Sequence, residues 1–224
     1  NLDVEWTDGE WQTGGRPELV MEHWLQDAKE IIGADGVTEV ALRLRHGDIV
    51  ETVEGQEADA SIVVIGKRGE AADFAKMHLG SNLERIVRAA KAPVFVASRA
   101  FAPIKSILIA YDGGVSAMKA VDYVARNPLF AGLACTLVTI GTPSEALKRG
   151  LEDARATLAA GGHSADVKVV QGTPEAALGE LVDEEAHDLL VMGAYGHSRI
   201  RSMIIGSTTT QMIRTCKVPV VLVK

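Results

Sequence analysis

The chain has 224 residues, of which 47% are hydrophobic, and its 30 acidic and 23 basic side chains give a formal net charge of −7. This composition suits a soluble chain that folds as one large domain or two of ordinary size. An acidic chain without long Lys or Arg runs argues against recruitment to nucleic acid or to an acidic membrane by bulk charge. No apolar run approaches about 18 residues, so we expect no membrane span and, by default, a cytoplasmic location.

The first half begins with a polar, glycine-containing segment over residues 1–16, which we interpret as a loop. Apolar residues with helical spacing then predict a helix over 17–32, which Gly33 ends. Alternating and apolar runs indicate several shorter elements beyond it. These are a strand over 40–44, a helix over 49–53, a strand over 61–65, a helix introduced by residues 79–82, and a strand over 93–97.

The second half continues the alternation of strands and helices. Thr142-Pro143-Ser144-Glu145 has a capping-box pattern with proline at the first helical position, and Thr173-Pro174 opens another helix. Strands that alternate with helices predict a parallel sheet covered on both faces, with ligands at the carboxyl ends of the strands. The expected strands are 107–111, 137–140, 167–170, 189–192 and 219–223, separated by helices.

The two cysteines, Cys135 and Cys216, stand in a predicted strand and a predicted helix. They form no CxxC motif and no cluster with histidine, so neither a metal site nor a redox pair is indicated. We interpret both as buried, reduced packing residues.

A glycine-rich segment follows the predicted strand 189–192. Gly193 and Gly196 are followed by nine residues and then by Gly206-Ser207-Thr208, which opens a predicted helix. Glycines permit close backbone approach, and the free N–H groups and dipole of a helix N-terminus attract anions. The segment therefore predicts a phosphate site.

The same pattern occurs earlier in the chain. Gly66-x-x-Gly69 precedes Gly193-x-x-Gly196 by 127 positions (193 − 66), and Gly80-Ser81 precedes Gly206-Ser207 by 126 (206 − 80). This self-similarity indicates an internal duplication, with domains over 1–100 and 101–224. Too few residues precede the first glycine pair for a full copy, so we expect the first domain to lack its opening β-α-β unit.

The pattern G-x-x-G, nine residues, then G-S/T, between a strand and the last helix, resembles the nucleotide-binding signature of the universal stress protein family. Asp112-Gly113-Gly114 after a strand and the ending Lys-x-Pro-Val-x-x-Val resemble that family too. The resemblance implies an open five-stranded parallel, doubly wound sheet in each domain. ATP, or AMP or ADP, would lie across the carboxyl ends of the first, second and fourth strands.

The resemblance also implies a role for individual residues. The chain lacks both GxxxxGK[ST] and GxGxxG, so backbone amides and hydroxyls must supply most of the phosphate binding. Ribose and phosphates would be contacted by Gly193, Ala194, Gly196 and His197, and the terminal phosphates by Gly206, Ser207 and Thr208. Asp112 would contact the ribose or Mg²⁺. The backbone of Ile140 would contact the adenine.

Simpler readings stand beside these assignments. Glycines after a strand could simply form a turn, Asp112 could merely cap a helix, His197 could be a solvated loop residue, and Thr209 could be helix surface.

The first copy departs from the pattern, because its loop has ten residues and Asn82 stands where the second copy has Thr208. Glu70 and Asp73 add negative charge there, so the first site should bind ATP poorly, although Lys67 and Arg68 could offset part of that charge.

The leading hypothesis is a cytoplasmic ATP-binding stress-response or regulatory protein, with any hydrolysis slow because no positioned base is evident. The alternative is an interaction module without a ligand that works by edge pairing of strands 93–97 and 219–223. Such pairing would join the two domains within one chain or two chains in a homodimer. A receiver domain with Asp112 as phosphoacceptor fits poorly, since no second acidic residue accompanies Asp112.

Overall fold

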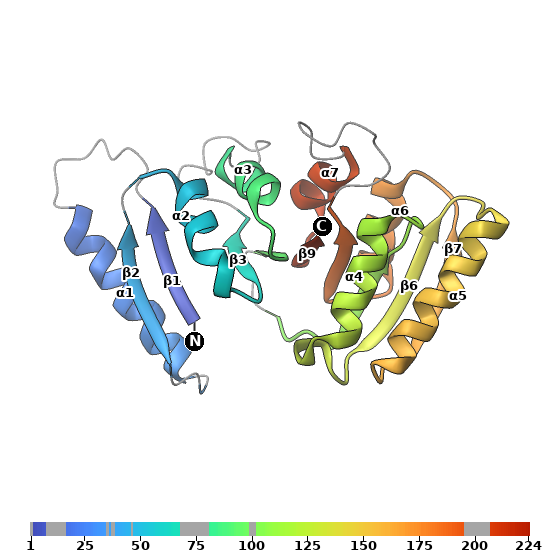
Figure 1. The fold of residues 1–224 in the computed structure, drawn as a ribbon, viewed down its shortest axis with the longest axis horizontal. Coiled ribbons are helices and arrows are strands. Elements are labelled where there is room, and N and C mark those ends of the chain that lie inside the picture. Colours follow the sequence, from blue (N-terminus) through green and yellow to red (C-terminus); the bar gives the residue numbers. More distant parts are fainter. Residues whose placement is uncertain are drawn as a thin grey trace. The chain divides into compact units, whose positions relative to one another are not determined.

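The computed structural model describes residues 2–7, 17–34, 36, 39–45, 47–67, 81–98, 102–194 and 207–224. Helices and strands alternate along the chain, as the sequence predicts (Figure 1). By packing, the chain falls into two compact units, Asn1–Gln56 and Glu57–Lys224. The domain boundary at residue 100 rests on the sequence repeat and stays a prediction. Among the described residues, no helix is both long and apolar enough to cross a membrane.

The first unit contains a two-stranded parallel sheet and two helices. β1 runs alongside β2 with Leu2 opposite Val40 and Thr7 opposite Arg45. The prediction of a loop is therefore wrong for residues 2–7, where Leu, Val and Trp alternate with Asp, Glu and Thr at the spacing of a half-buried strand. The elements are β1 (Leu2–Thr7), α1 (Pro17–Ala34), β2 (Val40–Arg45) and α2 (Ile49–Gln56).

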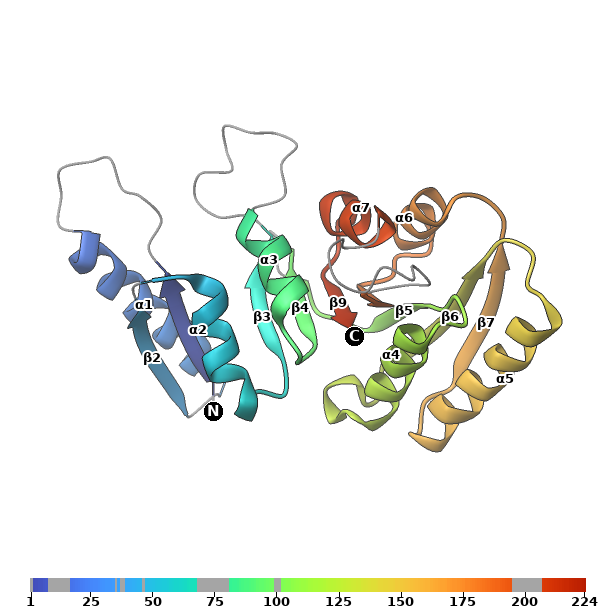
Figure 2. The same ribbon diagram turned by 45° about the horizontal axis from the view of Figure 1, so that its top comes forward.

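The second unit contains a seven-stranded sheet in the order β3-β4-β9-β8-β5-β6-β7. Its neighbouring strands are parallel except β4 and β9, which lie side by side in Figure 2 and pair antiparallel with Val94 opposite Leu222. Its elements are β3 (Val63–Gly66), α3 (Ser81–Ala89), β4 (Val94–Ala97), β5 (Ser106–Ala110), α4 (Val115–Arg126), β6 (Ala134–Ile140), α5 (Glu145–Ala160), β7 (Ala165–Val170), α6 (Pro174–Glu184), β8 (Leu189–Gly193), α7 (Ser207–Thr215) and β9 (Val220–Val223).

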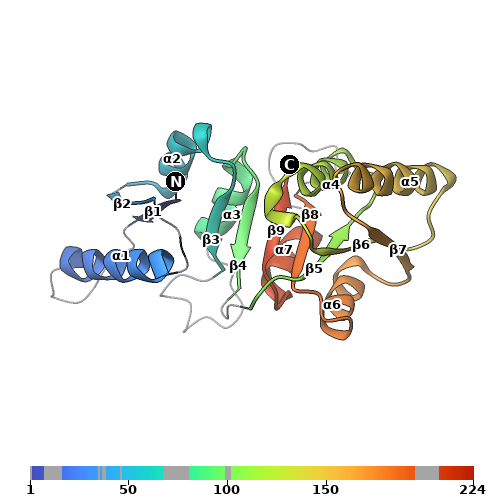
Figure 3. The ribbon, with the colours of Figure 1, turned by 90° about the horizontal axis from the view of Figure 1, so that it is seen from below.

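Five of these strands, β9-β8-β5-β6-β7, form the open parallel sheet that the sequence predicts for the second repeat. Helices α4 and α5 cover one face, and α6 and α7 cover the other (Figure 3). The central strand β5 is covered on both sides, which explains its continuous apolar run of Ile107, Leu108 and Ile109, all fully buried. Cys135 is buried as predicted, and burial raises the pKa of its thiol to about 11.

The first repeat is more complete than predicted. β1, α1, β2, α2, β3, α3 and β4 follow the same order as the elements from β6 to β9, and β1 pairs with β2 as β6 pairs with β7. Among the described residues, counterparts are therefore missing only for the opening strand β5 and helix α4. The sequence analysis predicted that the first repeat lacks an opening strand, helix and second strand. The second strand is present as β1, in the segment that was expected to be a loop, so that part of the prediction is wrong.

The start of α5 also differs from the prediction. Ser144, not Thr142, is the N-cap, and its Oγ accepts a hydrogen bond of 3.2 Å from the Leu147 N–H. The strand β6 continues to Ile140, so the chain uses the next residues to leave the sheet before a helix can begin. The start of α6 at Pro174, with Thr173 as N-cap, is confirmed.

Candidate functional site

Three strands of the second repeat end at the same edge of the sheet. In the order β8-β5-β6 all three are parallel, and Ala110 of β5 lies opposite both Val138 of β6 and Met192 of β8. Asp112, Ile140 and Gly193 each stand within two residues of that line, so the structure brings them to one edge. The chain moves from β5 outward to β6 and β7, then returns to β8 on the other side, which makes β5 and β8 the switch point where open α/β sheets bind ligands.

Asp112 lies exposed just beyond β5, at the start of α4. Its Oδ1 accepts a hydrogen bond of 2.8 Å from the N–H of Gly114, the N-cap of α4. This bond closes a turn just before the helix, and α4 has no side-chain cap hydrogen bond, so the interpretation of Asp112 as a helix cap is not confirmed. The negative charge is favoured there by the dipole of α4. Beside it, burial and then the negative charges of Asp153 and Asp112 raise the pKa of Tyr111.

The end of β6 is hydrogen-bonded to the strand on each side of it, β5 and β7. The N–H of Tyr111 donates to the Val138 carbonyl at 2.8 Å, and the Thr139 hydroxyl donates back to the Tyr111 carbonyl. On the other side, the Gly141 N–H donates to the Val170 carbonyl at 2.7 Å. The half-buried Ile140 therefore holds a fixed position next to the end of β5.

Gly193 has a packing role that the sequence motif did not reveal. A Cβ built on this residue would lie 2.6 Å from Ser116 Oγ and 2.8 Å from the Ala117 backbone nitrogen. Real Cβ atoms do not approach other atoms so closely, so only glycine lets the end of β8 meet the first turn of α4. This requirement exists whether or not a ligand binds.

Ala194 is completely buried and connects three elements. Its N–H donates to the Val223 carbonyl of β9 at 2.7 Å, and its carbonyl accepts a hydrogen bond of 3.3 Å from Thr209 Oγ1. The N–H of Ala194 is thus used by the sheet, so this residue can only form the floor of a site. Thr209 is 3% exposed, so its interpretation as helix surface is wrong.

Thr208, the second residue of α7, is half-buried and makes a contact that the sequence analysis missed. Its Oγ1 donates a hydrogen bond of 2.7 Å to Glu175 Oε1, in the first turn of α6. A carboxylate therefore lies against the hydroxyl that was predicted to hold terminal phosphates. No sequence signal connected these residues, because they are 33 positions apart and on different helices.

Part of the predicted site lies outside the described residues. This is true of Gly196, His197 and Gly206, and of the side chain of Ser207, although Ser207 itself begins α7. Within the described ranges no group of three or more His, Cys, Asp or Glu side chains is arranged to hold a metal ion. Magnesium in nucleotide sites commonly needs only one or two carboxylates besides phosphate oxygens and water, and Asp112 fits that role.

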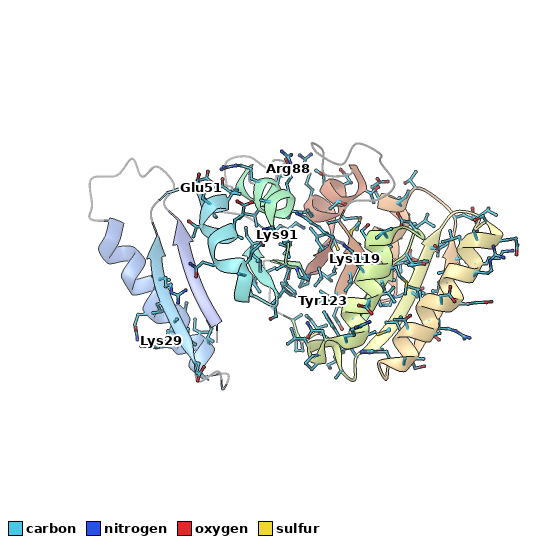
Figure 4. The ribbon with its side chains drawn as sticks, in the orientation of Figure 1. Lys29, Glu51, Arg88, Lys91, Lys119 and Tyr123 are labelled. Carbon is cyan, nitrogen blue, oxygen red and sulfur yellow. The ribbon has the colours of Figure 1, made fainter. Side chains whose placement is uncertain are left out.

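Residues of the first repeat contact the second repeat around β4 and β9. Lys67 Nζ donates to the Cys216 carbonyl, just after α7, at 2.5 Å, so this ammonium lies at the opposite end of α7 from its N-terminus. Arg88 is on α3 (Figure 4), and its carbonyl accepts a hydrogen bond of 2.5 Å from Lys224 Nζ. An ion pair of 3.8 Å joins Arg214 of α7 to Glu84 of α3.

The fold and the site together define a class of protein. An open parallel sheet, covered on both faces and carrying a helix N-terminus beside its switch point, is a doubly wound α/β domain of the kind that binds nucleotides. The sequence profile of the Universal stress protein family matches residues 4–98 and 139–224. The chain belongs to the universal stress protein family.

Individual relatives agree with this membership. A universal stress protein of Synechocystis sp. is 36% identical over 198 residues, which cover 88% of this chain and 69% of that protein. One of Thermus aquaticus is 34% identical over 54% of this chain and 98% of its own length. The crystal structure of a universal stress protein from Archaeoglobus fulgidus shares the fold over the whole chain, with a TM-score of 0.70 at 22% identity and 88% of that structure covered.

Proposed function

We propose that the second repeat binds an adenine nucleotide, with ATP as the expected ligand and AMP or ADP as alternatives. The chain would then be a cytoplasmic stress-response or regulatory protein whose choice of partner depends on nucleotide occupancy. The observation that carries the proposal is the meeting of Asp112, Ile140, Gly193 and the start of α7 around one switch point.

In this proposal each group has a limited task. The exposed carboxylate of Asp112 accepts hydrogen bonds from the ribose hydroxyls or holds Mg²⁺, and Ile140 borders the adenine. The N–H groups that open α7 receive the phosphates, together with the glycine segment around residues 196, 197 and 206. The Glu175 carboxylate, which lies beside that helix start, accepts a hydrogen bond from the Thr208 hydroxyl, and we expect hydrolysis to be slow at most.

The proposal predicts that Ser207→Glu abolishes ATP binding, because it adds a negative charge at the helix N-terminus that receives the phosphates. Calorimetric titration of the purified chain with ATP measures this directly. Gln211→Glu, which adds the same charge at an exposed position one turn further along α7, is the matched control. Gly196→Asp should also weaken binding. A wild-type chain without ATP binding, or equal binding by the Ser207 and Gln211 variants, would contradict the proposal.

We further propose that the two repeats replace a homodimer by pairing within one chain. This is supported by the antiparallel pairing of β4 with β9 and by the ion pair between Glu84 and Arg214. The expected mass in solution is that of one chain, 23.8 kDa, at all concentrations tested by light scattering. A mass that doubles with concentration would instead favour edge pairing between chains.

If the chain binds no nucleotide, the better account is the alternative hypothesis of an interaction module without a ligand.

A further inference from the structure

The contact between Thr208 and Glu175 joins the N-terminal turns of two helices. Thr208 is the second residue of α7, and Glu175 is the second residue of α6. The hydrogen bond of 2.7 Å between Thr208 Oγ1 and Glu175 Oε1 holds both side chains, which are half-buried. The carboxylate therefore lies close to the N-terminus of α7 as well as to that of its own helix.

This position favours a negative charge for the same reasons that favour a phosphate. The first turn of α7 contains no acidic residue of its own, whereas Glu175 is an acidic residue in the first turn of α6. Helix dipoles and unsatisfied N–H groups attract any nearby anion, whether it is a side chain or a ligand. Glu175 thus supplies to α7 an internal anion that a bound phosphate chain would have to displace or tolerate.

We propose that Glu175 is a specificity-determining residue that competes with the terminal phosphates of a nucleotide. The inference rests on the proposed nucleotide site in the second repeat. A triphosphate brings more charge toward the start of α7 than a monophosphate does, so repulsion by the carboxylate lowers the affinity for ATP more than that for AMP. The Thr208 hydroxyl becomes available to a phosphate only after it leaves Glu175.

The test is the ratio of ATP to AMP affinity in charge-neutral variants of the full chain. Glu175→Gln removes the charge but keeps an oxygen that can accept from Thr208, and Glu175→Ala also releases the hydroxyl. Glu180→Gln, at an exposed position on the same helix, is the matched control for net charge. We expect Glu175→Gln to bind ATP about tenfold more tightly, a gain of about 1.4 kcal/mol, with less than about a threefold change for AMP.

The outcomes separate this inference from the function on which it rests. If the wild type binds ATP and the ATP to AMP ratio of Glu175→Gln equals that of Glu180→Gln, the competition is refuted while the nucleotide site stands. If Glu175→Gln binds ATP more weakly in Mg²⁺, the carboxylate assists the metal and the proposal is overturned. If no variant binds either nucleotide, both the inference and the proposed function fail.

Discussion

Gly193→Ala is expected to destabilise the chain by about 3 kcal/mol and to remove nucleotide binding with it. The new methyl group would lie 2.6 Å from Ser116 Oγ and 2.8 Å from two backbone atoms of the first turn of α4. A backbone atom cannot rotate away, so β8 and α4 must separate. That separation changes the edge on which Asp112 and the start of α7 meet. Denaturant unfolding, followed by ATP titration of the folded fraction, measures both effects.

Two further substitutions sharpen this prediction. Gly179→Ala, in α6, places its methyl group in open space and should be neutral or stabilising by up to about 1 kcal/mol, as expected of glycine to alanine in a helix. Ser116→Ala removes the nearest side-chain atom but leaves the two backbone atoms, so it should rescue Gly193→Ala only slightly. Full rescue, or a Gly193→Ala chain as stable as the wild type, would show that the close approach is not required.

Gly161→Ala is expected to cost about 3 kcal/mol or more while leaving the affinity of the folded chain for nucleotide unchanged. Gly161 is the C-cap of α5, and a Cβ there would lie 2.1 Å from the Ala125 carbonyl oxygen near the end of α4. Its φ of −81° suits any residue, so the close helix contact alone demands glycine. The contact joins the C-terminal ends of α4 and α5, whereas the site lies at the N-terminal end of α4, which is why binding should survive.

Gly162 provides the contrast for this second prediction. Its φ is +86°, and no heavy atom lies within 4 Å of a Cβ built on it. Gly162→Ala therefore strains the backbone but brings the new methyl group against no neighbouring atom. Left-handed backbone costs a non-glycine residue about 1–2 kcal/mol. Chemical denaturation should therefore rank Gly161→Ala as the more damaging of two adjacent substitutions. The reverse order would mean that backbone conformation, rather than the α4–α5 contact, limits stability there.

The sequence predicted the architecture well because its signals are local or repeated. Alternating strands and helices, the glycine pairs 127 residues apart and the Asp112 turn together indicated the parallel sheet and the family, and both are confirmed. The strand β1 was missed because its six residues stand in a polar, glycine-containing stretch, although Leu2, Val4 and Trp6 alternate as a strand should.

The candidate site was predictable only in part. Asp112, Ile140 and Gly193 follow from the rule that parallel strands end at one edge, and the structure brings them together. The proximity of Glu175 to Thr208 depends on how α6 and α7 pack on one face, which no local pattern encodes. The close contact of Gly193 with α4 is likewise tertiary. The roles of Gly196, His197 and Gly206 stay predictions.

The most direct test of the account is to map where an adenine nucleotide binds. Photolabelling the intact chain with 8-azido-ATP, followed by peptide mass spectrometry, locates the adenine on the sequence. We expect one label per chain, displaced by excess ATP, in peptides that border the ends of β5, β6 or β8, such as those containing Asp112, Ile140 or Gly193. Labelling confined to the first repeat, or labelling that ATP does not displace, would contradict a nucleotide site in the second repeat.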